Sequence, residues 1–164
     1  WTVDGRDYGE LLVHDEECVY SVKVHKSRGH GQFIEPGKNA YQIIATERAE
    51  VVPRRPDAEP LNFGTWPRAK DVRWELATPM RVTAMLLGGN TLVCAGTPDV
   101  LDPEDPWAVY EGRRGGILYA LSTEDGEKMS ELLLDAAPVY DGMAVACGRL
   151  YLSTVDGTLI SICE

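Results

Sequence analysis

The chain has 164 residues, which suits one domain, and its 44% hydrophobic and 26% charged residues are those of a globular protein that can bury a core. The 26 acidic residues outnumber the 16 basic ones, and the net charge of −10 disfavours nucleic acid and anionic membranes as partners, because Lys and Arg bind such surfaces. The 16 glycines and 10 prolines favour an all-β fold with many turns, and no apolar run is long enough to span a membrane.

The first predicted group of strands occupies approximately residues 8–78 and includes two long insertions. Apolar and β-branched residues predict four strands, at 11–14 (LLVH), 19–25 (VYSVKVH), 41–46 (YQIIAT) and 72–77 (VRWELA). The segments 26–40 and 50–70 are rich in Gly and Pro, so we expect them to be loops.

Two further groups follow, at approximately 80–138 and 139–164. A hairpin at 85–96 (MLLGGNTLVCAG) recurs at 143–154 (MAVACGRLYLST), and a strand at 115–121 (GGILYAL) recurs at 156–162 (DGTLISI). The segment 128–134 (KMSELLL) fits a fourth strand of the middle group, although its spacing also fits a short amphipathic helix. The final group lacks a fourth strand.

The offsets between these repeats indicate one structural unit. The hairpins are 58 residues apart and the following strands 41, and the difference of 17 is an insertion within residues 97–114. A period of roughly 40 to 50 residues of strand and turn is typical of β-propeller blades of four antiparallel strands. The sequence therefore predicts one all-β domain, residues 1–164. It is a partial β-propeller of about three four-stranded blades with loop insertions, the last blade incomplete.

Residues 115–128 (GGILYALSTEDGEK) resemble the repeat of pyrroloquinoline-quinone-type (quinoprotein-like) propellers. Residues 81–100 and 138–163 resemble the last blades of large bacterial, planctomycete-like proteins of that type, and residues 8–24 resemble the blade before them. The resemblance implies a periplasmic or secreted protein whose full propeller is larger than this chain. It also implies pyrroloquinoline quinone and calcium as cofactors, but no residue here matches a family catalytic or calcium position, and adjacent cysteines are absent from the sequence.

The insertion carries the only candidate interaction site. Its acids are hard oxygen donors of the kind calcium prefers, yet their spacing matches no calcium loop, and ion pairs within the loop are the favoured interpretation. An aromatic residue beside acids and arginines is also how carbohydrate-binding and peptide-binding surfaces are built. The candidate residues are Asp99, Asp102, Glu104, Asp105, Trp107, Arg113 and Arg114.

Other residue types receive structural interpretations. We interpret Trp66 and Trp74 as packing between neighbouring blades. The histidines (His14, His25, His30) are scattered, and no serine lies in a nucleophile-elbow motif, so neither a metal site nor a hydrolase triad is assigned. Of the cysteines, Cys94 and Cys163 are predicted to be buried in strands, Cys147 to be partly exposed at a turn, and all four to be free thiols.

Two functions are compatible with these observations. The favoured one is a non-catalytic propeller scaffold or binding module that contacts a protein or carbohydrate through its loops. The alternative is a fragment of a quinone-dependent oxidoreductase whose active site lies mostly in other blades. Because three blades do not close a ring, we expect the remaining blades of a parent protein, or self-association, to cover the open ends, with residues 1–4 as the candidate for the absent fourth strand.

Overall fold

The computed structural model describes residues 2–3, 7–8, 11–23, 37, 41–48 and 72–163. Within these ranges the chain forms strands, turns and loops, and no helix. The all-β class predicted from the Gly and Pro content and from the strand patterns is confirmed.

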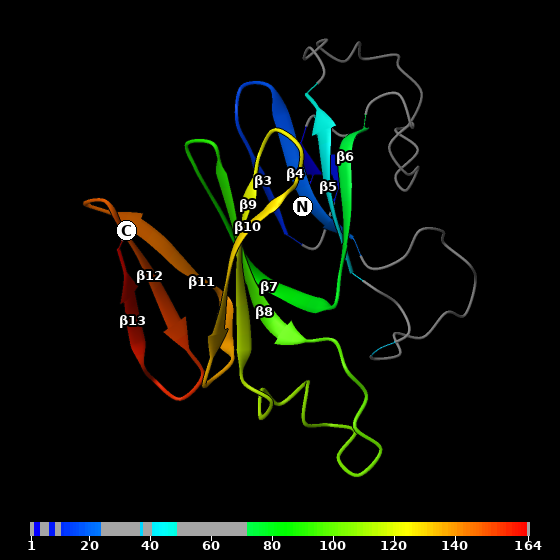
Figure 1. Cartoon of the computed structure of the whole chain (residues 1–164), viewed down its shortest axis with the longest axis vertical. Coiled ribbons are helices and arrows are strands. Elements are labelled where there is room, and N and C mark those ends of the chain that lie inside the picture. Colours follow the sequence, from blue (N-terminus) through cyan, green and yellow to red (C-terminus); the bar gives the residue numbers. More distant parts are fainter. Residues whose placement is uncertain are drawn as a thin grey trace, which may run out of the picture.

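Three antiparallel sheets contain eleven of the strands (Figure 1). The first sheet consists of β3 (Leu12–His14), β4 (Cys18–Lys23), β5 (Tyr41–Glu47) and β6 (Val72–Thr78). The middle sheet consists of β7 (Met80–Gly88), β8 (Thr91–Pro98), β9 (Gly116–Ser122) and β10 (Lys128–Leu134). The last sheet consists of β11 (Pro138–Ala146), β12 (Arg149–Thr154) and β13 (Leu159–Ile162).

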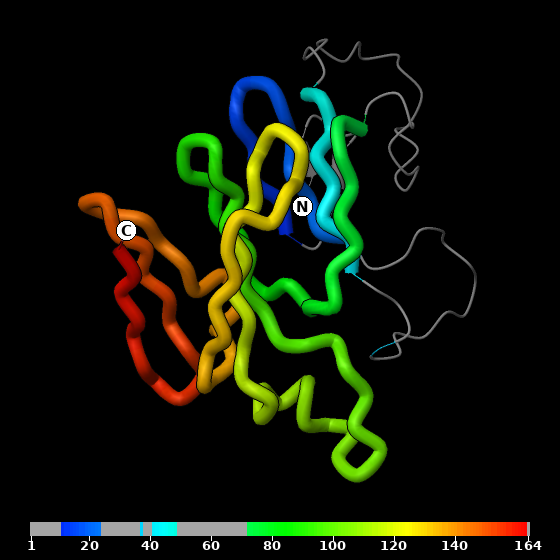
Figure 2. Tube along the Cα trace, in the orientation of Figure 1, coloured from blue at the N-terminus to red at the C-terminus, as the bar shows by residue number. Residues whose placement is uncertain are grey.

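Each sheet is a meander of consecutive strands, and the tube in Figure 2 passes through the three sheets in chain order. The prediction of four, four and three strands is confirmed, and residues 128–134 form a strand rather than a helix. The predicted loops at 26–40 and 50–70 lie outside the described residues, apart from Gly37.

The N-terminal residues behave differently from the prediction. Thr2–Val3 do form a strand, β1, but it pairs antiparallel with β2 (Asp7–Tyr8) in a separate two-stranded sheet. The strand character of Thr2–Val3 is therefore confirmed, whereas their predicted place as the fourth strand of the last sheet is wrong within this chain. The nearest strand in sequence competes successfully because joining it closes only a short loop.

Short turns fix the register of the hairpins. In the middle sheet Gly88 pairs with Thr91 across a two-residue turn. In the last sheet Ala146 pairs with Arg149, and both turn residues, Cys147 and Gly148, have positive φ angles of 52° and 70°. Positive φ at both central residues is the geometry whose twist suits a tight hairpin.

The sheets stack face to face, and the middle one is covered on both sides. Alternate residues of β8 point in opposite directions, so Leu92 and Cys94 belong to the core shared with the first sheet, whereas Val93 and Ala95 face the core shared with the last sheet. The inner strand β7 lies next to both β3 and β11. The first strand of each sheet is an edge strand, and β7 lies between β3 and β11 along one side of the stack.

Candidate functional site

The candidate interaction loop, residues 99–115, joins β8 to β9 at one edge of the sheet stack. It extends away from the strands at the bottom of the view in Figure 1. The connections from β6 to β7 and from β10 to β11 reach the same edge, because Met80 at the start of β7 pairs with Pro98 at the end of β8, and Leu134 at the end of β10 pairs with Gly116 at the start of β9. The insertion predicted from the repeat offsets is therefore an ordered loop at the edge of the stack where the chain turns from one strand into the next.

Buried residues and backbone hydrogen bonds hold this loop in shape. Ala108 and Val109 are 2% and 3% exposed, and they anchor the middle of the loop. Successive turns are closed by backbone bonds, including Ala108 N to Asp105 O at 3.1 Å and Arg113 N to Ala108 O at 2.9 Å. The Asp102 carboxylate also accepts a bond from Glu104 N at 3.0 Å. The loop is therefore a preorganised surface.

The acidic residues of the loop are largely engaged by its arginines. Arg113 donates two bonds to the Asp105 carboxylate, at 2.6 and 2.7 Å, and also pairs with Glu111. Arg114 pairs with Asp102. The predicted ion pairs within the loop are confirmed, and such exposed pairs order the loop more than they stabilise the fold.

Asp99 is separate from these ion pairs, although it is their neighbour in sequence. Its side chain is 9% exposed, and it accepts a hydrogen bond from Gly37 N at 3.1 Å. Burial raises the pKa of this carboxyl, and the Gly37 bond and the charge of Arg81 only partly oppose that increase. Asp99 therefore links the β8–β9 loop to the backbone at Gly37.

Two aromatic side chains of the loop are exposed, and Trp107 is the most exposed large hydrophobic residue in it. Trp107 is 67% exposed and Tyr110 is 39% exposed, with ring centroids 6.1 Å apart and planes tilted by 56°. The Arg81 guanidinium, from β7, lies 5.1 Å from the centre of the Tyr110 ring, within the range of a cation–π contact. Trp107, Tyr110 and Arg81 form a surface that we call the aromatic platform.

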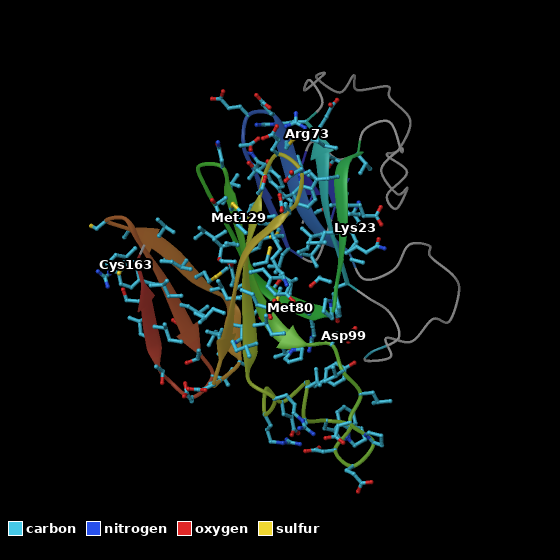
Figure 3. The ribbon with its side chains drawn as sticks, in the orientation of Figure 1. Lys23, Arg73, Met80, Asp99, Met129 and Cys163 are labelled. Atoms are coloured by element: carbon cyan, nitrogen blue, oxygen red, sulfur yellow. The ribbon has the colours of Figure 1, made fainter. Side chains whose placement is uncertain are left out.

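The sequence interpretation included Trp107 but missed the other two members of the aromatic platform. Tyr110 was detectable, because it follows Trp107 by three residues in a turn-rich segment. Arg81 was not detectable without the strand register, which pairs it with Thr97 immediately before the loop. In Figure 3 the side chains of the loop lie below the labelled Asp99.

Trp74 has the structural role predicted for it. Its ring packs 5.9 Å from that of Tyr20, and its indole N–H donates a 2.9 Å bond to the carbonyl of Thr123 in the middle sheet. Gly126 in the same turn has a φ of 75°, and a Cβ there would lie 2.6 Å from the Trp74 ring. Trp74 thus connects the first two sheets, while Trp66 lies outside the described residues.

Asp15 organises the β3–β4 turn rather than a reactive centre. Its carboxylate accepts bonds from the backbone N–H of Cys18 and Glu17 and from the Tyr20 hydroxyl. Burial alone would raise the pKa of Asp15, but these bonds outweigh it, and the pKa lies below its ordinary value. His14 is exposed at the end of β3, whereas His25 and His30 lie outside the described residues.

The cysteines divide into two pairs. Cys18 and Cys94 are buried, and burial raises the pKa of both thiols. Cys147 and Cys163 are exposed. The predictions for Cys94 and Cys147 are confirmed, and the burial of Cys163 is wrong, because β13 ends at Ile162 and nothing described covers the outer face of the last sheet.

The described residues do not assemble a metal site. No three His, Cys, Asp or Glu side chains in the described part of the chain lie close enough together to hold a metal ion. Arginines occupy the carboxylates of the loop that would have to face calcium. Asp102 and Asp105 therefore do not fit a calcium site in this loop.

Comparison with known proteins adds no relative, since no protein-family model and no curated protein matches the chain. Across the described ranges, no helix has the length and apolarity needed to cross a membrane.

Proposed function

We propose that this chain is an arc of a β-propeller that serves as a non-catalytic binding module of a larger extracytoplasmic protein. The architecture is supported by three stacked meanders whose first strands, all edge strands, follow one another along one side of the stack, as the innermost strands of propeller blades do. The ends of the arc are then covered by further blades of the parent protein or by self-association.

The main support for a binding role is that Trp107 is 67% exposed on a loop whose shape is fixed by hydrogen bonds and ion pairs. An indole in water has apolar area available for a partner, and a rigid loop loses little conformational entropy when it binds. Trp, Tyr and Arg are also the residue types most enriched where protein interfaces concentrate their binding energy, and the aromatic platform contains one of each. We therefore favour a protein partner.

Selection from a random peptide library displayed on phage tests this role. The library is selected on the full chain and counter-selected on Trp107→Ala. We expect peptides whose affinity falls by about tenfold or more in Trp107→Ala and in Tyr110→Ala, as for residues at the centre of an interface. Tyr140→Ala is the matched control, since Tyr140 is a 60% exposed aromatic residue outside the loop.

Two outcomes would overturn the proposal. Enriched peptides that bind Trp107→Ala as well as the unmodified chain would remove the aromatic platform from the function. A stoichiometric change in the absorbance of added pyrroloquinoline quinone and calcium would instead favour the oxidoreductase alternative.

A further inference from the structure

The β8–β9 loop carries an excess of negative charge. Residues 99–115 include five acidic residues and two arginines, and the whole chain has a net charge of −10. The loop belongs to the middle sheet, and both sheets that flank the middle sheet are present in this chain. It is therefore not part of an open end of the stack, and its surface charge is a property of the stack itself.

Arginines of this chain already bind the acids and an aromatic ring at this loop. Arg113 donates two hydrogen bonds to the Asp105 carboxylate and also pairs with Glu111. The guanidinium of Arg81 lies 5.1 Å from the centre of the Tyr110 ring. The loop thus binds guanidinium groups in two ways, by paired hydrogen bonds to carboxylates and through the face of an aromatic ring.

One carboxylate and one aromatic ring of the loop have no arginine. Glu104 is exposed, and its carboxylate makes no hydrogen bond or ion pair with the residues that the structure describes. The Trp107 indole is 67% exposed, and its ring neighbour Tyr110 is tilted against it by 56°. Within the described ranges no cation lies over the indole. Both groups are therefore available to a cation from outside the chain.

Trp107 and Glu104 are close enough to contact the same segment of a partner. They are three positions apart, so their Cα atoms are separated by at most about 11 Å. The chain between them is more compact than an extended segment, because turns at 102–105 and 105–108 are closed by backbone hydrogen bonds of 3.2 and 3.1 Å. An arginine combines a long flexible stem with a planar head, which suits a ring and a carboxylate placed in this way.

We propose that Trp107 and Glu104 bind an arginine side chain of the partner protein, an inference that rests on the proposed binding role of the aromatic platform. The guanidinium stacks on the indole, as Arg81 does on Tyr110, and pairs with the Glu104 carboxylate. The segment that carries this arginine is basic overall, because it must complement an acidic loop.

Other ligands fit this pair of residues less well. Lysine carries the same charge, but its ammonium is strongly hydrated and has no planar face to stack on the indole. An acidic segment would be repelled by the excess of carboxylates in the loop. A neutral sugar could stack on Trp107, but it has no charge to complement Glu104. Arginine alone combines a planar face with a positive charge.

Arginine-containing peptides test the inference on the full chain. The probe is a short fluorophore-labelled peptide of Gly-Ser-Arg repeats, and two matched peptides carry citrulline or lysine in place of arginine. Citrulline keeps the planar head and loses the charge, whereas lysine keeps the charge and loses the plane. Measured by fluorescence anisotropy, we expect the citrulline peptide to bind about tenfold more weakly than the arginine peptide, and the lysine peptide about threefold.

Matched charge variants of the chain locate the arginine. Glu104→Gln should weaken the arginine peptide about threefold and leave the citrulline peptide unchanged. Glu124→Gln is the control, because Glu124 is an exposed acid in the β9–β10 turn and its substitution removes the same overall charge. Trp107→Ala should weaken the arginine peptide about tenfold, since both the stacking and the position of the guanidinium are lost.

Three results would overturn the inference. They are equal binding of the arginine and citrulline peptides, equal effects of Glu104→Gln and Glu124→Gln, and no saturable binding of the arginine peptide up to about 10 mM. The phage selection separates this failure from that of the binding role. Selected peptides that depend on Trp107 but contain no arginine would refute the arginine and keep the binding role, whereas a selection without any peptide that depends on Trp107 would refute both.

Discussion

The middle and last sheets contain the same hairpin pattern but differ in burial. In the middle sheet, Leu92 and Cys94 of β8 are fully buried. In the last sheet, Leu152, the repeat equivalent of Cys94, is also fully buried against the middle sheet, whereas Leu159 on the outer face is 65% exposed although its equivalent in the middle sheet, Leu118, is 6% exposed. The strands are similar, and the difference is the number of neighbouring sheets. Burial in this fold is therefore decided by position in the stack as much as by local sequence.

A matched pair of leucine truncations should give the largest contrast. Leu92→Ala removes a fully buried side chain between two sheets, and we expect it to lower the free energy of unfolding by about 2–5 kcal/mol. Leu159→Ala removes an exposed one and should change it by less than about 0.5 kcal/mol. Urea denaturation measures both. Comparable costs would show that the outer face of the last sheet is covered in solution.

The cysteines should show the same contrast in reactivity. In the native protein a maleimide should label Cys147 and Cys163, which are exposed, and leave Cys18 and Cys94 unlabelled. The thiolate is the reactive form, and burial raises the pKa of the two inner thiols. Mass spectrometry should find two labels per chain before unfolding and four after it. Rapid native labelling of Cys94 would contradict the two-sided cover of the middle sheet.

Asp99 in the β8–β9 connection and Asp156 in the β12–β13 connection should change the stability of the fold with pH in opposite directions. Burial raises the pKa of Asp99 above 3.8, so its carboxyl favours folding at low pH, and that contribution is lost as the pH rises through the folded-state pKa. Hydrogen bonds from Thr154 and Thr158 lower the pKa of Asp156, so its contribution is present above 3.8 and is lost as the pH falls.

Asp99→Asn and Asp156→Asn test these signs in unfolding titrations from about pH 3 to 7. Relative to the unmodified chain, Asp99→Asn should gain stability as the pH rises, and Asp156→Asn should lose it. The same sign for both variants would be inconsistent with a buried Asp99.

The smallest effect is expected at the β11–β12 turn. Cys147 has a φ of 52°, a conformation that Asn adopts more readily than other non-glycine residues. Cys147→Asn should raise the free energy of unfolding by about 0.5 kcal/mol, and Cys147→Ala should not. A thermal melt of both variants measures this, and a stabilising Ala would point to removal of the thiol as the cause.

The strands were predictable because their evidence is local. Apolar alternation and turn residues located the hairpins, and the repeat offsets identified the ordered insertion. The stacking of one sheet on the next was harder to predict, since no local sequence pattern shows which face of a sheet is covered. Cys163 illustrates this limit: it follows an apolar run that would be buried in a middle sheet, but the run lies at the end of the stack.

The sequence predicted which residues form the interaction loop, but it predicted only some of their contacts. Its arginines and acids pair as expected, because opposite charges close in sequence meet readily in a tight loop. Asp99 was grouped with them by proximity in the chain, yet it faces Gly37, which is 62 residues away in sequence. Arg81 entered the aromatic platform through the strand register, which spacing along one segment does not reveal.

The meander topology also has a kinetic consequence. Each sheet is assembled from hairpins between consecutive strands, so most pairing closes short loops, and such contacts form quickly. The bond from Trp74 to Thr123 spans 49 residues and can form only after two sheets have met. Each sheet is then stabilised by its own pairing and by its interfaces with the adjacent sheets, as in a linear repeat protein. Amide protons of β13 should exchange with solvent first and those of β8 last, so opening proceeds from the exposed end of the stack inward.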